Sequence, residues 1–302
     1  MITAKNVVKS YSRKLVLDNI NLHIPKGAIY GFLGPNGAGK TSFIRIINQI
    51  TAPDKGEILL HNNPIKPSDI GRIGYLPEER GLYQKMKVGE QVLYLARLKG
   101  LSNSEAKERA KKWFDRLDMN HFWEKKVEDL SKGMAQKVQF VTTVMHEPEL
   151  LIFDEPFTGF DPINTNLIKS EILRLREEGA TVIFSTHRME SVEEICDHIG
   201  LINEGRVMVE GPLLDIRKHY QNGVYLFIVK NPIDQWSDGT VLKEHKHHKG
   251  YSYTVKFKDY PGAVVGELAK MGELVFFDEV LPSVQDIFIE IVEDSTKSNP
   301  NE

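Results

Sequence analysis

The sequence predicts an α/β fold with a buried, mostly parallel sheet, followed by a smaller α+β domain. Over roughly the first 200 residues, short apolar runs of the β type alternate with longer helical patterns. One of these runs leads directly into a glycine-rich loop and then into a further helical pattern. The pattern of apolar runs and helical stretches changes near residue 220. We therefore expect two domains, residues 1–219 and 220–302.

In the first domain, the expected buried strands cover residues 29–33, 73–76, 150–153 and 181–185. The last two are rich in Ile, Val, Leu and Phe, which suits strands covered on both faces. Helical patterns cover residues 43–50 and 164–178, and Asp161-Pro162 precedes the second as an N-cap with proline in the first turn. Residues 200–211 read as a hairpin, and residues 212–220 as a short helix.

The second domain is expected to contain three strands, two helices and a polar tail. The strands are predicted at residues 224–229, 251–257 and 273–277, the helices at 262–271 and 282–292, and the tail at 294–302. His245, His247 and His248 fall in what reads as a polar loop, and a metal site there is disfavoured because no cysteine or carboxylate pair lies nearby.

Composition narrows the class of protein. The chain has 302 residues, 41% of them hydrophobic and 27% charged, which is enough apolar material for a sizeable core. Its mean hydropathy is −0.32, and no apolar run approaches the ~18–20 residues of a membrane span. A single cysteine argues against a disulfide framework, and a net charge of −3 gives no reason to expect nucleic-acid binding. We expect a cytoplasmic globular protein.

A phosphate-binding loop is predicted at residues 34–41. The sequence Gly-Pro-Asn-Gly-Ala-Gly-Lys-Thr matches the P-loop pattern, lies after a strand and opens a helix. Glycines let the backbone amides point inward at phosphate oxygens, and the helix adds its positive end. Lys40 would reach the β- and γ-phosphates, and the Thr41 hydroxyl would bind Mg²⁺. A chance glycine-rich turn is the alternative.

An apolar strand ending in two carboxylates, at residues 150–155, resembles a Walker B segment. Asp154 would hold Mg²⁺, and Glu155 would polarise the attacking water as general base. A strand-terminal acidic turn, which is common in α/β sheets, is the alternative interpretation.

Residues 130–134, Leu-Ser-Lys-Gly-Met, lie between these motifs and lead into a helix that runs toward His146. With the P-loop upstream and the Asp-Glu strand downstream, they resemble the signature of the ATP-binding cassette (ABC) family. Three further features agree in order: Tyr11, where the family places an aromatic residue that stacks on adenine, the segment 158–161, and His187 after the next strand. The resemblance covers about residues 2–217.

The resemblance implies a P-loop NTPase cassette with a mostly parallel sheet core, an antiparallel β subdomain and a helical subdomain. It implies binding of ATP and Mg²⁺. The implied nucleotide-binding residues are Tyr11, Gly34, Asn36, Gly37, Ala38, Gly39, Lys40, Thr41, Ser42, Ser131 and Gly133. The implied catalytic residues are Glu155, His187 and Lys40, and the implied metal ligands are Thr41, Asp154 and Glu78.

The family mechanism implies a homodimer. Ser131 and Gly133 of one chain would contact the γ-phosphate held by the P-loop of the other, and Asp161 would couple the two sites. A serine hydroxyl and a helix N-terminus agree with this role, because together they form an anion site. The resemblance also implies a separate membrane permease and a location on the cytoplasmic face of the membrane.

Two positions depart from the common family pattern. Glu78 stands where glutamine is usual, so a charged oxygen would face Mg²⁺ in place of a neutral one. The signature reads SKGM, although Ser131 and Gly133 are kept. With the C-terminal helix, these variants are similar to those of bacterial exporters of the drug-resistance and sodium-efflux branch. In that branch the loop at residues 78–88 would face the permease.

Two alternatives remain open at this stage. One is a soluble ABC ATPase that acts on ribosomes or DNA, which is disfavoured by the single cassette and the net charge of −3. The other is a nucleotide-responsive regulator without hydrolysis, which is disfavoured by the presence of Glu155 and His187.

Overall fold

The computed structural model describes residues 1–79, 81–233, 236, 239–248 and 250–298. The chain divides into two compact units, Met1–Leu213 and Leu214–Glu302, which are described separately below. The division falls at the start of helix α7 (Leu213–His219), ahead of the boundary at 219/220 expected from the sequence. Within the described residues, no helix combines the length and the apolar character needed to cross a membrane.

A six-stranded sheet in the order β10-β9-β3-β8-β7-β6 forms the centre of the first unit. The strands are β3 (Ile29–Leu33), β6 (Ile73–Leu76), β7 (Leu150–Asp154), β8 (Thr181–Thr186), β9 (His198–Asn203) and β10 (Arg206–Pro212). All neighbours are parallel except the hairpin β9–β10. β3, β7 and β8 are buried at every residue, as their apolar composition predicts. Their carboxyl ends therefore meet at one edge of the sheet.

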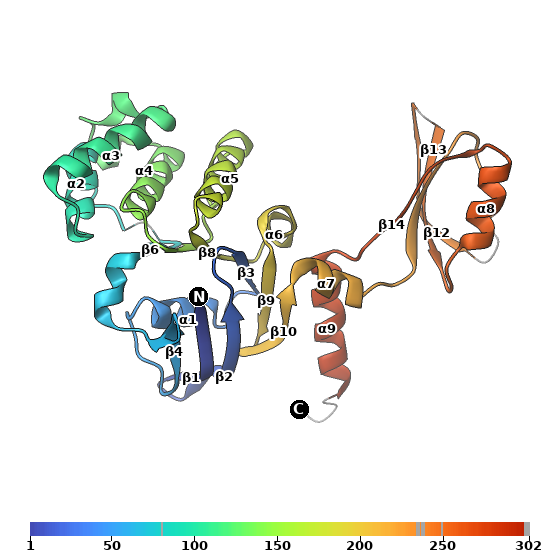
Figure 1. Cartoon of the computed structure of the whole chain (residues 1–302), viewed down its shortest axis with the longest axis horizontal. Coiled ribbons are helices and arrows are strands. Elements are labelled where there is room, and N and C mark those ends of the chain that lie inside the picture. Colours follow the sequence, from blue (N-terminus) through green and yellow to red (C-terminus); the bar gives the residue numbers. More distant parts are fainter. Residues whose placement is uncertain (80, 234–235, 237–238, 249, 299–302) are drawn as a thin grey trace. The chain divides into compact units, whose positions relative to one another are not determined.

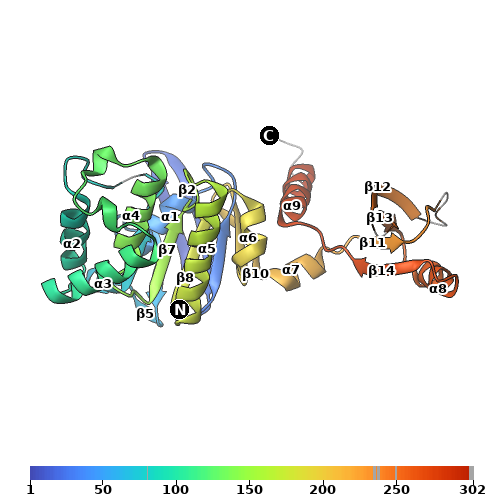
Figure 2. The same ribbon diagram turned by 90° about the horizontal axis from the view of Figure 1, so that it is seen from above.

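Helices cover this sheet. They are α1 (Lys40–Ile47), α4 (Lys132–Val144), α5 (Pro162–Glu177) and α6 (Met189–Ile195). Figure 2 shows α4 and α5 running along β7 and β8. Asp161 caps α5 as predicted, and its side chain accepts a hydrogen bond from the Asn164 amide at 2.9 Å.

A second, antiparallel sheet has the order β2-β1-β4-β5. Its strands are β1 (Ile2–Tyr11), β2 (Lys14–Ile24), β4 (Lys55–Leu60) and β5 (Asn63–Pro64). Buried residues of both sheets join one hydrophobic core with α1, for example Leu17 of β2, Phe43 of α1 and Ile152 of β7. This shared core fixes β2 near the loop that precedes α1.

Helices α2 (Val88–Leu98) and α3 (Asn103–Arg116) group with α4 at one end of this unit (Figure 1). Short 3₁₀ turns, η1 (Pro67–Arg72), η2 (Asn120–Phe122) and η3 (Val127–Asp129), connect the surrounding segments. Aromatic rings hold the group together: Trp123 lies edge-to-face with Phe114 at 5.0 Å, and Trp113 with Phe140 at 5.8 Å.

The second unit contains an antiparallel sheet in the order β12-β13-β11-β14. Its strands are β11 (Val224–Val229), β12 (Gly239–His247), β13 (Gly250–Phe257) and β14 (Leu274–Glu279), and its helices include α8 (Gly262–Lys270) and α9 (Val284–Ser298). Phe227, Tyr253 and Val255 form the core of this sheet, against which Val264 and Leu268 of α8 pack.

Two predictions for this unit were wrong. The polar segment containing His245 is the edge strand β12, because main-chain pairing with β13 holds it in place while its side chains stay exposed. Residues 294–298 continue helix α9 rather than forming a tail, and residues 299–302 of the predicted tail lie outside the described residues.

Candidate functional site

The loop between β3 and α1 adopts a backbone that requires glycine at two positions. Gly34 has φ +152°, and a Cβ there would lie 2.1 Å from the carbonyl oxygen of Ile202. Gly39 has φ +110°, and its Cβ would lie 2.7 Å from the carbonyl oxygen of Val16. A side chain at either position would therefore collide with main chain that cannot move freely. Ala38, which completes the loop, is buried.

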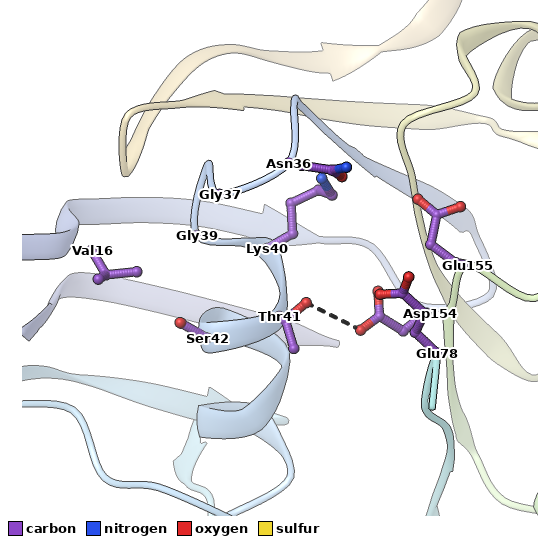
Figure 3. A pocket seen from close by; sticks show the side chains of 10 residues that line it. All are labelled: Val16, Asn36, Gly37, Gly39, Lys40, Thr41, Ser42, Glu78, Asp154 and Glu155. Atoms are coloured by element: carbon purple, nitrogen blue, oxygen red, sulfur yellow. Dashed lines mark hydrogen bonds between the residues drawn. The ribbon is translucent and has the colours of Figure 1, made fainter. Parts of the chain in front are cut away.

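A pocket of about 320 Å³ opens in front of this loop (Figure 3). It is lined by Val16, Asn36, Gly37, Gly39, Lys40, Thr41, Ser42, Glu78, Asp154 and Glu155. Nine of these ten were predicted site residues, and the ten together come from four separate segments of the chain. Val16 was missed, because only the packing of β2 beside the loop brings it there. The Gly205 amide donates to the Ala38 carbonyl at 3.0 Å, and the Asp18 amide donates to the Gly205 carbonyl at 2.8 Å, so the loop and β2 are tied together.

Lys40 is buried in the loop, with 7% of its surface exposed. Its Nζ donates hydrogen bonds to the carbonyl oxygens of Gly34 at 2.7 Å and Pro35 at 3.0 Å. Burial lowers the pKa of Lys40, and the pocket's three carboxylates act in the opposite direction. The side chain is thus held in the loop by two main-chain acceptors and lies near acidic neighbours.

Asp154 and Thr41 face each other across the pocket, with Thr41 Oγ1 donating to Asp154 Oδ2 at 3.3 Å (Figure 3). Glu78 joins them because β6 and β7 are parallel neighbours whose carboxyl ends coincide. Burial raises the pKa of Asp154, and the charges of Glu78 and Glu155 raise it further. Hydroxyl and carboxylate oxygens gathered at one point are the donors that a small divalent cation prefers.

Glu155 is a buried carboxylate with a defined set of donors. Its Oε1 accepts a hydrogen bond from the His187 amide at 2.8 Å and lies 2.6 Å from His187 Nδ1. Its Oε2 accepts from the Thr186 hydroxyl at 3.0 Å. Its backbone has φ +51°, and its amide donates to the Ser185 carbonyl at 2.9 Å. The end of β8 therefore fixes the carboxylate at the pocket wall, where it could accept a proton from water.

Tyr11 ends β1 with 41% of its surface exposed, and Lys9 Nζ lies 5.5 Å from the centre of its ring. It is not among the residues that line the pocket. Gly34 and Ala38 belong to the loop but do not line the pocket. His187 does not line it either, but it contacts Glu155, which does. Adenine stacking on Tyr11 therefore remains a prediction.

The predicted signature residues lie at the start of α4. Ser131 is the N-cap of this helix, and its hydroxyl accepts a hydrogen bond from the Met134 amide at 3.2 Å. Ser131 is exposed, and Gly133 is half-buried close to the backbone of Gly159. Neither residue lines the pocket of its own chain. The exposed first turn of α4 thus presents backbone donors and a hydroxyl to the outside.

Comparison with known families agrees with this geometry. Residues 17–158 match the family described as ABC transporter. Residues 211–292 match the family described as the C-terminal domain of DrrA1-3-like ATP-binding proteins.

Individual relatives extend the likeness over almost the whole chain. An uncharacterized ABC transporter ATP-binding protein of Bacillus subtilis, YhaQ, is 38% identical over 97% of this chain and 98% of its own length. The bacitracin transport ATP-binding protein BcrA of Enterococcus faecalis is 35% identical over 72% of this chain and 71% of its own. Among solved structures, a dimeric ATP-binding cassette with ADP and Pi bound superposes with a TM-score of 0.65. It has 25% identity and covers 70% of this chain and 99% of that one.

Proposed function

The chain belongs to the ABC transporter family of ATPases, and we propose that it is the ATP-hydrolysing subunit of an exporter whose membrane permease is a separate polypeptide. One observation carries this proposal: a P-loop lysine, a metal-type cluster of hydroxyl and carboxylates, and a histidine-bound glutamate meet at one pocket. We assign residues 1–219 to the ATP-binding domain and residues 220–302 to an accessory domain.

Nucleotide binding is proposed to use the loop amides and Lys40. Residues 36, 37 and 39–42 line the pocket, so amides of this loop would donate to phosphate oxygens, and α1 adds its positive N-terminal end. Lys40 would exchange its bonds to the Gly34 and Pro35 carbonyls for bonds to the β- and γ-phosphates. Adenine would stack on Tyr11.

The Mg²⁺ ligands are proposed to be Thr41 Oγ1, the carboxylate of Asp154 and the carboxylate of Glu78. The raised pKa of Asp154 supports this assignment, since a dication would relieve the repulsion among the pocket's acidic groups. Among the described residues there is no group of three or more His, Cys, Asp or Glu side chains able to hold a metal ion. When bound, Mg²⁺ neutralises charge on the phosphates.

Hydrolysis is proposed to use Glu155 as general base. Its carboxylate would orient a water molecule in line with the γ-phosphate and accept its proton. Thr186 and His187 hold the carboxylate in place through its two oxygens. His187 would also bond the γ-phosphate. The position of its ring would therefore affect both the Glu155 carboxylate and the γ-phosphate.

A second copy of the chain is proposed to complete each site. Ser131 and Gly133 lie outside the pocket of their own chain, and the exposed first turn of α4 fits the γ-phosphate of a partner. The dimeric arrangement of the related cassette supports this proposal. It predicts that Ser131→Arg prevents ATP-dependent dimerisation of a Glu155→Gln chain in analytical ultracentrifugation, whereas Ser104→Arg, at an exposed position of α3, does not.

A groove of about 430 Å³ beside the 78–88 segment is the proposed contact for the permease. It includes Ile70, Leu82, Leu95 and Leu98, and Leu98 has 65% of its surface exposed. An exposed apolar groove of this kind suits an inserted helix. This contact would hold the chain on the cytoplasmic face of the membrane. The relative that is named for bacitracin transport, and the match to the DrrA1-3-like C-terminal domain, support the exporter assignment.

The direct test of the transporter role is co-purification. The chain should be co-expressed with a candidate membrane permease and recovered as a complex in detergent. Leu98→Glu should abolish recovery, whereas Leu173→Glu, on the exposed side of α5, should not. Nucleotide binding should be unchanged in both variants. Absence of any membrane partner for the unmodified chain would contradict the proposal.

A further inference from the structure

Helix α4 contains two buried glutamines whose amide groups reach the loops that bear the pocket's glutamates. Gln139 has 4% of its surface exposed and Gln136 has 3%. Gln136 Nε2 donates to the carbonyl of Pro156, the residue after Glu155, at 3.4 Å. Gln139 reaches the other loop, the one that contains Glu78.

The bonds of Gln139 lie on both sides of Glu78. Its Nε2 donates to the Pro77 carbonyl at 3.3 Å and to the Glu79 carbonyl at 3.3 Å. One amide group therefore holds the peptide units that flank Glu78, while the Glu78 side chain is left exposed toward the pocket. Because two separated carbonyls share the same donor, a shift of the glutamine moves the backbone on both sides of that side chain.

The helix is well anchored to the sheet beside this loop. Phe140, next to Gln139, stacks on Phe153 of β7 at 5.7 Å between ring centres. Phe153 pairs with Leu76 of β6, two residues before Glu78. Gln139 and the loop that contains Glu78 are thus both attached to the strand pair β6 and β7. Packing of the core therefore fixes their relative position.

The other end of α4 is Ser131, the exposed N-cap assigned above to the partner's γ-phosphate. Two turns of helix separate it from Gln139, and residues 135–144 of this stretch are buried. A displacement of Ser131 along the helix axis would therefore be carried to the amide of Gln139. Helices of this length transmit such shifts as nearly rigid bodies.

We propose that Gln139 is a positioning residue that sets the Glu78 carboxylate for Mg²⁺ and links it to the signature end of α4. This inference rests on the proposed function, since it concerns the same metal site. Removing the donor should free the Pro77–Glu79 backbone and lower the affinity for Mg²⁺ to which Glu78 contributes, without removing any group that touches the nucleotide.

The test is equilibrium binding of a fluorescent, non-hydrolysable ATP analogue to the full chain, titrated with Mg²⁺. Gln139→Met keeps the length and burial of the side chain but has no donor. We expect the half-saturating Mg²⁺ concentration to rise roughly 3- to 10-fold, the change that loss of one or two weak hydrogen bonds gives. Binding measured in EDTA should stay within about 2-fold. Gln139→Glu, which places an acceptor against two carbonyls, should have a larger effect.

A double-mutant cycle separates positioning from general damage to the helix. In a Glu78→Ala background, Gln139→Met should no longer change the Mg²⁺ dependence, because the group that it positions is gone. Val141→Ala, at a buried apolar site of the same helix, should leave the Mg²⁺ dependence unchanged. Thermal unfolding shows whether each variant is folded. If Gln139→Met is not folded, Gln139→Glu or Gln139→Asn can be used in its place.

Three results would overturn the inference: an unchanged Mg²⁺ dependence in Gln139→Met, an equal change in the Glu78→Ala background, or an equal change in Val141→Ala. These results differ from failure of the proposed function. If the unmodified chain bound no nucleotide with Mg²⁺, the assignment of the whole site would fail; if it did bind and only the Gln139 variants behaved like the unmodified chain, the positioning role alone would fail.

Discussion

The Nδ1 atom of His187 lies 2.6 Å from Oε1 of Glu155, which also accepts the His187 main-chain amide at 2.8 Å. A carboxylate can only accept hydrogen bonds, so the Nδ1–H group of His187 donates to Glu155. The pair therefore fixes the orientation of both the carboxylate and the imidazole ring.

Replacing His187 with alanine should lower the rate of ATP hydrolysis while leaving nucleotide affinity nearly unchanged. The main-chain bond to Glu155 persists, so the carboxylate stays near its position but loses one donor. We expect kcat to fall about 10- to 100-fold, less than for loss of the base itself. Steady-state hydrolysis assays, with binding of a fluorescent analogue alongside, check this. A drop in affinity with kcat preserved would contradict the assigned role.

Asp154→Asn should stabilise the metal-free chain at neutral pH. Burial and neighbouring acidic groups raise the pKa of Asp154 above its ordinary value of 3.8, so the unfolded chain ionises first as pH rises. Stability is therefore lost as pH increases from 3.8 through the folded pKa, and the asparagine variant avoids that loss.

Urea unfolding in EDTA at several pH values measures this difference. The free energy of unfolding of Asp154→Asn should exceed that of the unmodified chain by an amount that grows from about pH 4 and then levels off. The same variant should lose the stabilisation that Mg²⁺ and ATP give to the unmodified chain. A constant difference at all pH values would show that the carboxyl does not titrate abnormally.

Gly34→Ala should disrupt the phosphate loop. Its Cβ would lie 2.1 Å from the Ile202 carbonyl, at a backbone φ of +152°. We expect a loss of about 1–3 kcal/mol in the free energy of unfolding, together with loss of nucleotide binding. Gly37→Ala is the matched control: its φ is +83°, but no atom lies within 4 Å of the added methyl, so it should cost only about 1 kcal/mol. Equal costs at the two positions would contradict the packing argument.

Much of the first unit could be predicted from the sequence, because its signals are local. The strand, loop and helix around Lys40 follow one another directly, and the Asp154 and Glu155 carboxylates end an apolar strand. Parallel pairing then brings these ends together without further information. Glu78 was implied by the family resemblance, as the residue that stands where glutamine is usual, and the structure places it just after the neighbouring strand β6.

The remaining features depend on contacts between segments that are distant in the chain. Such contacts produce no recognisable local pattern in the sequence. Val16 reaches the pocket only through the packing of β2, and Gln139 bonds the Glu78 loop across 60 residues of chain. Strand β12 was missed because its polar composition resembles a loop, whereas its structure comes from pairing with β13.

The most direct test of the proposed function is ATP hydrolysis by the purified chain, compared with Glu155→Gln, in the presence of Mg²⁺. Glutamine keeps the size of the side chain but cannot accept the proton of water. The proposal predicts Mg²⁺-dependent hydrolysis that falls at least ~100-fold in Glu155→Gln, with ATP still bound. Equal hydrolysis by the two proteins, or none by the unmodified chain in complex with its permease, would contradict it.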